Sequence, residues 1–518
     1  MSKDDLLSHK YRPLVLLILD GWGVAGAQEG NAIHLAKTPF FDELAVKYPA
    51  LILNASGEAV GLGQKDPGNG QAGHLTLGAG RPVSTGLEQV NQAVKDKSFF
   101  KNTILNNTWR QLKKTQGTLH LIGTLSACQN EVAFGAMVEL AGRKKIKPFL
   151  HLIIDEAIDD KLAAKLTVVE AALTKAGGAM ATLMNVTVGL NLKNDLAATA
   201  LAYHLITAGV GRRVGSLQKL AEKNNADGAW LDKPIVLVGS DNKPRAVVQA
   251  GDAVIFFDYE PRARHLLKAV VVGDSDNKIQ KISDLQTVTL NNYENDLPAA
   301  IIFPPLAVKE TLSEVLARAD LKQLKISETG KSVEVNYFFN GGRMAAWPNE
   351  ERVIVASPAG NAADFTATEE VGQVAAAKIK SKIYDFIVIN LAGADEAGHG
   401  GNLEAVKKAV EQTDQSLRQI IKAVLEVGGL ALVTADHGQA EEMIDWQLDA
   451  PRPKHTDNPV PFLVVAKKWE GYNLGVSDAV AGDLSLLKPS GDLADVAPTI
   501  LKLLQIEAPE QMTGHSLL

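Results

Sequence analysis

Residues 13–20 read PLVLLILD, a continuous apolar run that ends in Asp20. Two later stretches have the same shape: DFIVINLAGAD at 385–395, interrupted only by Asn390, and LALVTAD at 430–436. Apolar runs that do not alternate with polar residues are typical of strands buried on both faces of a parallel sheet. We therefore predict an α/β fold in which helices cover such a sheet.

The residues between the second and third runs predict a covering helix. Apolar residues recur there at helical spacing, at Leu403, Val406, Val410, Leu417, Ile420, Ile421 and Val424. Strand, helix and strand in succession form a βαβ unit. Ligands of open α/β sheets bind just beyond the carboxyl ends of the strands. The aspartates that follow the three runs are therefore candidates for one shared site.

The middle of the chain has a different character. From about residue 85 to 305 there are again α/β patterns, such as TLHLIGTL and KPFLHLIID, but without comparable aspartate endings. We predict a discontinuous first domain made of residues 1–84 and 306–518, with a second domain inserted at 85–305.

Composition excludes several classes of protein. The 518 residues carry a net charge of −7, with no basic tract suited to nucleic acid. No apolar stretch reaches the roughly 20 residues of a membrane helix, and the first apolar run is too short for a signal peptide. A single cysteine, Cys128, cannot form an internal disulfide. We expect a cytoplasmic protein without a nucleic-acid or membrane partner.

Six residues of metal-binding type cluster around the predicted strand ends. They are Asp20, Asp395, His399, Asp436, His437 and His455. Carboxylates and imidazoles suit Mn²⁺ or Zn²⁺, and six of them suffice for two cations. Each residue alone has an ordinary alternative, since an aspartate after a strand is often a helix cap and a single histidine is often packed. The combination favours a site for two divalent metal ions, which can clamp the oxygens of a transferred phosphoryl group.

Longer segments resemble the cofactor-independent phosphoglycerate mutases of the alkaline phosphatase superfamily. They include LLILDGWG, GHLTLGAGR, FFNGG, AGHGGN, TADHG and HTDNPVPF, and they extend over nearly the whole chain. The resemblance implies an alkaline-phosphatase-like domain interrupted by a transferase-like domain, usually in a monomer. It also implies that Asp395, His399 and His455 hold one metal ion, while Asp20, Asp436, His437 and a serine hold the other.

The family interconverts 3- and 2-phosphoglycerate, small phosphorylated metabolites of glycolysis, through a phosphoserine. The family pattern G-N-S-E-V-G-H corresponds here to Gly68–His74, so Gly70 occupies the position of the nucleophile. Glycine has no oxygen with which to attack phosphorus or bind the metal. The surrounding stretch, GNGQAGHLTLGAGR at 68–81, is expected to be a glycine-rich loop at the ligand.

The cationic residues that hold the substrate in the family are also mostly replaced. Glu131 stands where the resemblance places a histidine, and Glu260 where it places an arginine. Val186 and Leu192 fall near two further lost arginines, and DEAIDD at 155–160 also lacks one. Lys331 matches the family lysine, and Arg262 or Arg264 can retain one arginine.

Three functions remain open on the sequence. The first is the mutase itself, with weak or absent activity, because no catalytic nucleophile is identified. The second is a metal-dependent hydrolase of another phosphate ester, in which water replaces the serine. The third is a catalytically silent, metal-binding homologue with a regulatory or binding role.

Overall fold

The computed structural model describes residues 6–7, 9–84, 86–125, 131–154, 160–190, 195–216, 233–259, 263–274, 279–294, 296–304, 307–358, 366–472 and 482–518. The chain divides into two compact units. One is formed by Met1–Thr85 with Leu306–Leu518, and the other by Gly86–Pro305.

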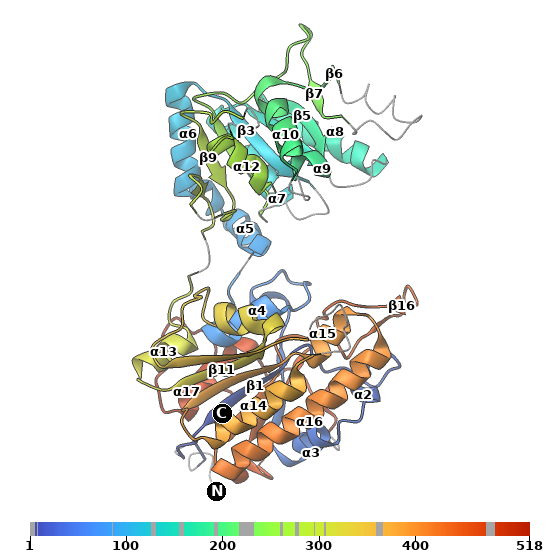
Figure 1. The fold of residues 1–518 in the computed structure, drawn as a ribbon, viewed down its shortest axis with the longest axis vertical. Helices are drawn as coiled ribbons and strands as arrows, with labels where there is room; N and C mark the ends of the chain where they lie inside the picture. Colours follow the sequence, from blue (N-terminus) through green and yellow to red (C-terminus); the bar gives the residue numbers. More distant parts are fainter. Residues whose placement is uncertain are drawn as a thin grey trace. The chain divides into compact units, whose positions relative to one another are not determined.

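The first unit is built on an eight-stranded sheet (Figure 1). Its order is β12 (Glu350–Val355), β11 (Gln323–Glu328), β13 (Phe386–Leu391), β1 (Leu14–Leu19), β14 (Leu430–Thr434), β17 (Val460–Val465), β2 (Ala50–Asn54) and β18 (Gly491–Asp492). The three predicted strands β13, β1 and β14 are adjacent and parallel, with Leu14 opposite both Phe386 and Leu430. Every residue of these strands is buried, so the predicted α/β sheet is confirmed.

One strand of this sheet runs against its neighbours. β17 pairs antiparallel with β14 on one side and with β2 on the other. The beginning of β17 therefore lies at the same edge of the sheet as the ends of β1, β13 and β14. This reversal matters for the site, because a residue just before β17 reaches the edge where the aspartates lie.

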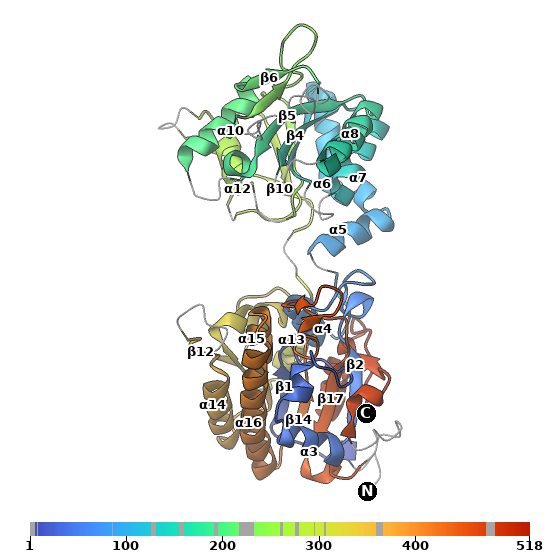
Figure 2. The same cartoon turned by 90° about the vertical axis from the view of Figure 1, so that its right-hand side faces the viewer.

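Helices cover the sheet. α14 (Thr368–Lys380) and α16 (Leu403–Val427) pack side by side along one face (Figures 1 and 2), and α15 (Gly393–His399) precedes α16. The predicted stripe of α16 is confirmed, with six of its seven residues buried and Leu403 partly buried. The other helices of this unit are α2 (Ala32–Leu35), α3 (Pro39–Lys47), α4 (Gly70–Ala79), α13 (Leu312–Arg318) and α17 (Val496–Leu503).

The expectation of a glycine-rich loop at 68–81 is wrong, because α4 occupies most of that stretch. The Asn69 side chain caps the helix by accepting a hydrogen bond from the Ala72 N–H at 2.9 Å, and Gly80 ends it in the left-handed conformation. The glycines serve close packing instead. A side chain at Gly73 would overlap the backbone of Asp436, and one at Gly78 would overlap the backbone of Phe339.

The substitution Gly78→Ala is expected to destabilise the first unit by about 1–3 kcal/mol, because the added methyl group has no room beside Phe339. Gly135→Ala is the control. Gly135 also lies in a helix, α7 (Glu131–Lys144), but a Cβ there meets no atom within 4 Å. Alanine should stabilise that helix by up to about 1 kcal/mol. Urea denaturation of both variants checks the difference, and equal effects would contradict the close-packing account.

A lysine is buried in β11. Lys325 donates a hydrogen bond to Asn340, and its Nζ lies 3.6 Å from Glu350 and 4.9 Å from the ring centre of Phe339. Burial lowers the pKa of Lys325 from 10.5 to about 7, although the charge of Glu350 opposes this.

This burial predicts a dependence of stability on pH. Between pH 7 and 10.5 the unfolded chain binds more protons at Lys325 than the folded chain does, so stability should rise with pH. The slope from this residue reaches about 1.4 kcal/mol per pH unit. In Lys325→Met that contribution disappears, while Arg352 still pairs with Glu350 at 2.6 Å. Denaturation at pH 7, 8 and 9 should show that the free energy of unfolding of wild type increases relative to that of the variant as the pH rises. A difference in unfolding free energy that stays constant with pH would contradict the prediction.

The second unit is built on another eight-stranded sheet (Figure 2). Its order is β10 (Ala300–Ile301), β9 (Gln286–Thr289), β8 (Ala253–Phe256), β3 (Leu119–Thr124), β4 (Pro148–Ile154), β5 (Ala179–Asn185), β7 (Ile235–Leu237) and β6 (Arg212–Val214). Only the β5–β7 pairing among the described strands is antiparallel. Its helices are α5 (Gly86–Lys95), α6 (Thr103–Thr115), α7, α8 (Asp160–Lys175), α9 (Val186–Gly189), α10 (Leu196–Ala208) and α12 (Arg264–Val271). In neither unit does a described helix have the length and apolarity needed to cross a membrane.

Candidate metal centre

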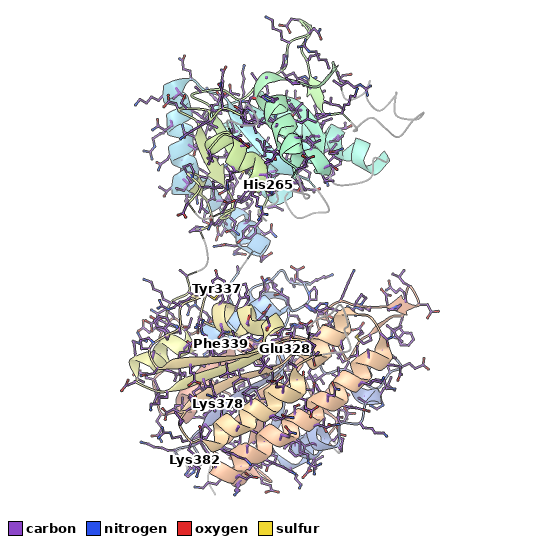
Figure 3. All side chains as sticks on the ribbon, in the orientation of Figure 1. His265, Glu328, Tyr337, Phe339, Lys378 and Lys382 are labelled. Atoms are coloured by element: carbon purple, nitrogen blue, oxygen red, sulfur yellow. The ribbon has the colours of Figure 1, made fainter. Side chains whose placement is uncertain are left out.

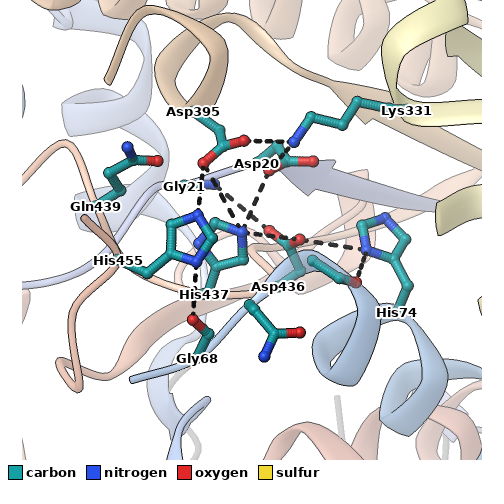
Figure 4. A network of polar contacts seen from close by, with 12 residues as sticks. Asp20, Gly21, Gly68, His74, Lys331, Asp395, Asp436, His437, Gln439 and His455 are labelled. Carbon is teal, nitrogen blue, oxygen red and sulfur yellow. Dashed lines mark hydrogen bonds and ion pairs between the residues drawn. The ribbon is translucent and has the colours of Figure 1, made fainter. Parts of the chain in front are cut away.

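The six candidate ligands lie together at one edge of the first sheet. Figure 4 shows five of them, Asp20, Asp395, Asp436, His437 and His455. Asp20 directly follows β1, and Asp436 and His437 follow β14. Asp395 and His399 lie one helical turn apart in α15, which begins just after β13. His455 precedes the antiparallel strand β17, so it reaches the same edge from the opposite chain direction.

Asp395, His399 and His455 form one group. His455 Nε2 lies 3.3 Å from both His399 Nε2 and Asp395 Oδ1, and His399 Nε2 lies 3.5 Å from the same carboxylate oxygen. Two imidazole nitrogens and a carboxylate oxygen thus converge on one point, as the ligands of a divalent cation do.

Asp20, Asp436 and His437 form the second group, all with fully buried side chains. His437 Nε2 lies 3.4 Å from Asp436 Oδ2 and 3.6 Å from Asp20 Oδ1. It lies 3.9 Å from Asp395 Oδ1, which connects this group to the first. These distances are too long for hydrogen bonds, and neither His437 Nε2 nor Asp436 Oδ2 makes one.

Neighbouring groups orient these side chains. His455 Nδ1 lies 3.0 Å from the Gly68 carbonyl oxygen, and His437 Nδ1 lies 3.3 Å from that of Gly438. A proton on each Nδ1 leaves the Nε2 atoms free as ligands. The Gln439 amide, turned to satisfy both of its ends, donates to Asp395 and accepts from the His399 N–H.

Two further residues of the site were not predicted as ligands. His74 lies in α4, with Nδ1 3.2 Å from Asp436 Oδ2, and Asp20, His74 and Asp436 could themselves hold an ion. Asn390 in β13 donates to Asp20 Oδ2 at 2.7 Å and lies 3.1 Å from His74 Nε2. For Asn390 the sequence did contain a signal, because this residue is the only polar one in an otherwise apolar predicted strand.

The pKa values follow from burial and from this crowding of charge. Burial and the charge of Asp436 raise the pKa of Asp20 to about 6. Burial would also raise the pKa of Asp395, but Lys331 and the neighbouring histidines outweigh it and hold that pKa well below its ordinary value. Burial lowers the pKa of His74, yet Asp436, with smaller contributions from Asp20 and Glu334, raises it overall. The charges of these neighbouring groups therefore influence one another strongly within the site.

Lys331 supplies one such charge. Its Nζ lies 3.1 Å from Asp20 Oδ1 and also pairs with Asp395, and its side chain is almost fully buried. Of the described lysines and arginines, only Lys331 forms an ion pair with any of the three aspartates, and it pairs with Asp20 and Asp395. One lysine does not balance three buried carboxylates, and unbalanced buried charge is costly. The donor set and the unbonded His437 Nε2 therefore fit divalent cations.

Comparison with known proteins places these residues in a family. A model of the metalloenzyme superfamily matches residues 12–508. The 2,3-bisphosphoglycerate-independent phosphoglycerate mutase of Chloroflexus aurantiacus is 36% identical, with 98% of both chains covered. The mutase 1 of Methanosarcina barkeri is also 36% identical over 98% of both chains. The chain belongs to this mutase family.

A solved structure agrees with that membership. The phosphoglycerate mutase of Leishmania mexicana, crystallised at low cobalt concentration, matches with a TM-score of 0.66 at 25% sequence identity and covers 98% of each chain. The family resemblance expected from the sequence is thereby confirmed, together with the fold.

Gly70, for which the sequence resemblance predicts the family's serine position, faces the second metal group. It is the first residue of α4. A Cβ built on Gly70 would lie 3.5 Å from Asp436 Oδ2 and 3.9 Å from His437 Nε2, with Glu334 Cγ at 3.4 Å. A Cβ would fit there at ordinary van der Waals distances, so the space for a larger side chain is present while the side chain is absent.

The structure describes only part of the expected substrate clamp. Arg262 and Glu260 lie outside the described residues, as does Leu192. Glu131 begins α7, where it pairs with Lys165 at 2.9 Å, and Val186 begins α9. Arg264 begins α12. These residues belong to the second unit.

Proposed function

We propose that this protein binds two divalent cations, Mn²⁺ or Zn²⁺, and a small phosphorylated metabolite, with phosphoglycerate mutase activity that is weak or absent. Asp395, His399 and His455 would hold one cation, and Asp20, Asp436 and His437 the other. The cations would supply positive charge to a phosphoryl group and acidify a water molecule. The observation that supports this proposal most is Gly70, which faces Asp436 and His437 but has no side chain and so no side-chain oxygen.

The residues of this chain have separate tasks in that site. The Lys331 Nζ pairs with Asp20 and Asp395. When cations bind these aspartates in its place, the Lys331 ammonium group becomes available to contact an anionic substrate. Buried Asn390 and the backbone N–H of Gly21, 3.4 Å from Asp436 Oδ1, hold the carboxylates in place. No hydroxyl at residue 70 is available to accept a phosphoryl group, so the phosphoserine route of the family is closed.

The open space at Gly70 favours a second candidate, hydrolysis of a phosphate ester. Among the described residues, no atom outside the adjoining part of α4 and its neighbours lies closer than 3.4 Å to the position of a Cβ there. A water molecule at this position could replace the serine hydroxyl as the nucleophile. A cytoplasmic monomer, the usual state expected from the resemblance, accords with either candidate.

A phosphatase assay separates these candidates from a silent homologue. The manganese-loaded protein is incubated with a generic aryl phosphate, beside Asp436→Asn and the exposed control Asp241→Asn. Hydrolysis that is lost only in Asp436→Asn supports the hydrolase. No turnover despite bound metal supports the silent homologue, and failure to bind any metal contradicts the proposed function itself.

A further inference from the structure

Glu334 lies in an unusual backbone segment next to Gly70. After β11 and its last residue Glu328, the chain forms a short 3₁₀ turn, η3 (Thr329–Lys331), and then one π-helical turn, η4 (Glu334–Phe338). Figure 3 labels Glu328 before this segment and Tyr337 and Phe339 at its end. Single π-helical turns are rare in proteins, and those that occur are often found at functional sites.

The spacing of this segment aims Glu334 toward the metal groups. Residues three apart share one face of a helical segment. Lys331 reaches Asp20 and Asp395, so Glu334, three residues later, shares that face. η4 also packs against α4, with the backbone of Phe339 against Gly78. This packing determines the position of Glu334 along α4 and places it beside the first turn of that helix.

Glu334 fills the space beside the missing side chain. The atom nearest to a Cβ built on Gly70 is Glu334 Cγ, at 3.4 Å, followed by Asp436 Oδ2 and His437 Nε2. Three groups thus converge within 4 Å of the point from which the family's serine would extend. The carboxylate oxygens of Glu334 extend two bonds beyond this Cγ, about as far as a serine hydroxyl extends from its own Cα.

Each of these three residues has one buried polar atom that lacks a hydrogen bond. Glu334 Oε2 is buried and makes none, and the same is true of Asp436 Oδ2 and His437 Nε2. Buried polar atoms rarely remain unpaired, and a cation shared among them would satisfy all three. Charge also allows a fourth carboxylate, because two divalent cations and Lys331 together exceed four carboxylates by one positive charge.

We propose that Glu334 replaces the serine as the fourth protein ligand of the cation held by Asp20, Asp436 and His437. This inference rests on the proposed function, since it requires metal at that group. A carboxylate is a stronger ligand for Mn²⁺ than a hydroxyl. The chain would then retain the cation but not the nucleophile, because Glu334 binds metal without offering the serine hydroxyl.

Isothermal titration calorimetry tests the assignment. The protein is first treated with EDTA to remove metal and is then titrated with MnCl₂. Wild type should bind two ions per chain. Glu334→Gln, which keeps the size of the side chain, should weaken one of them by at least tenfold and leave the other unchanged. The electron paramagnetic resonance spectrum at two equivalents of Mn²⁺ should change from that of a spin-coupled pair to that of a single bound ion.

Two further variants sharpen the result. Glu334→Gln combined with Gly70→Ser should regain the second ion, because the serine oxygen returns to the same position. Glu369→Gln, a change at an exposed residue of α14, should bind as wild type does. Two ions bound by Glu334→Gln with wild-type affinities would overturn the inference while leaving the proposed function standing. A wild type that binds no Mn²⁺ would instead refute the proposed function, and this inference with it.

Discussion

Manganese-loaded protein is expected to convert 3-phosphoglycerate to 2-phosphoglycerate more slowly than about 1 s⁻¹, the lower end of ordinary enzyme turnover. The reason is chemical, since Gly70 at the start of α4 has no side-chain hydroxyl to receive the phosphoryl group. A coupled assay that consumes 2-phosphoglycerate measures the rate. Turnover above that value would contradict the loss of the mutase route.

The single change Gly70→Ser should not restore the activity. A serine fits the space, but the sequence replaces much of the expected cationic clamp, with Glu131 and Glu260 at two of its positions. Carboxylates at those positions would repel a phosphorylated acid rather than hold it. Full recovery in Gly70→Ser alone would show that the clamp residues are not required in this chain.

Removal of the metal is expected to have the second large effect. Ligands that bind only the folded chain stabilise it, by about 2.7 kcal/mol per site at a free concentration of one hundred times Kd. Addition of Mn²⁺ should therefore raise the Tm, and EDTA should reverse the rise. In Asp395→Asn most of the rise should vanish, because Asp395 Oδ1 faces His399, His455 and His437.

The control for this experiment is Asp241→Asn, an exposed aspartate of the second unit. It should respond to Mn²⁺ as wild type does. An equal rise in Tm for Asp395→Asn and wild type would place the stabilising ion elsewhere. A lower Tm of Asp395→Asn without metal would be a separate effect, since that variant also loses the ion pair with Lys331.

The sequence predicted the sheet well because burial on both faces leaves a strong pattern. The runs ending before Asp20 and Asp436 contain no alternation, and the structure makes them β1 and β14 at the centre of the sheet. The gathering of aspartates followed from the same reasoning, since parallel strands end at one edge. His455 was predicted from its residue type and from the family resemblance. Its place at that edge depends on the antiparallel direction of β17, which the apolar run that follows it does not reveal.

Local composition misled at α4. Glycine-rich sequence usually indicates a loop, but here the Asn69 cap and the need for close approach to Asp436 and Phe339 favour a helix made of small residues. His74 and Glu334 were missed for another reason. Neither has metal-ligand spacing to another residue in the chain, and both reach the site through packing between α4 and η4.

Native mass spectrometry of the manganese-loaded protein mixed with 3-phosphoglycerate tests the central claim most directly, because it reports metal and covalent phosphate together. The account predicts that the native chain carries two manganese ions. It also predicts that the chain carries no covalently bound phosphoryl group after the mixture is quenched and denatured. A denatured chain heavier by one phosphoryl group, or a native chain without metal, would contradict it.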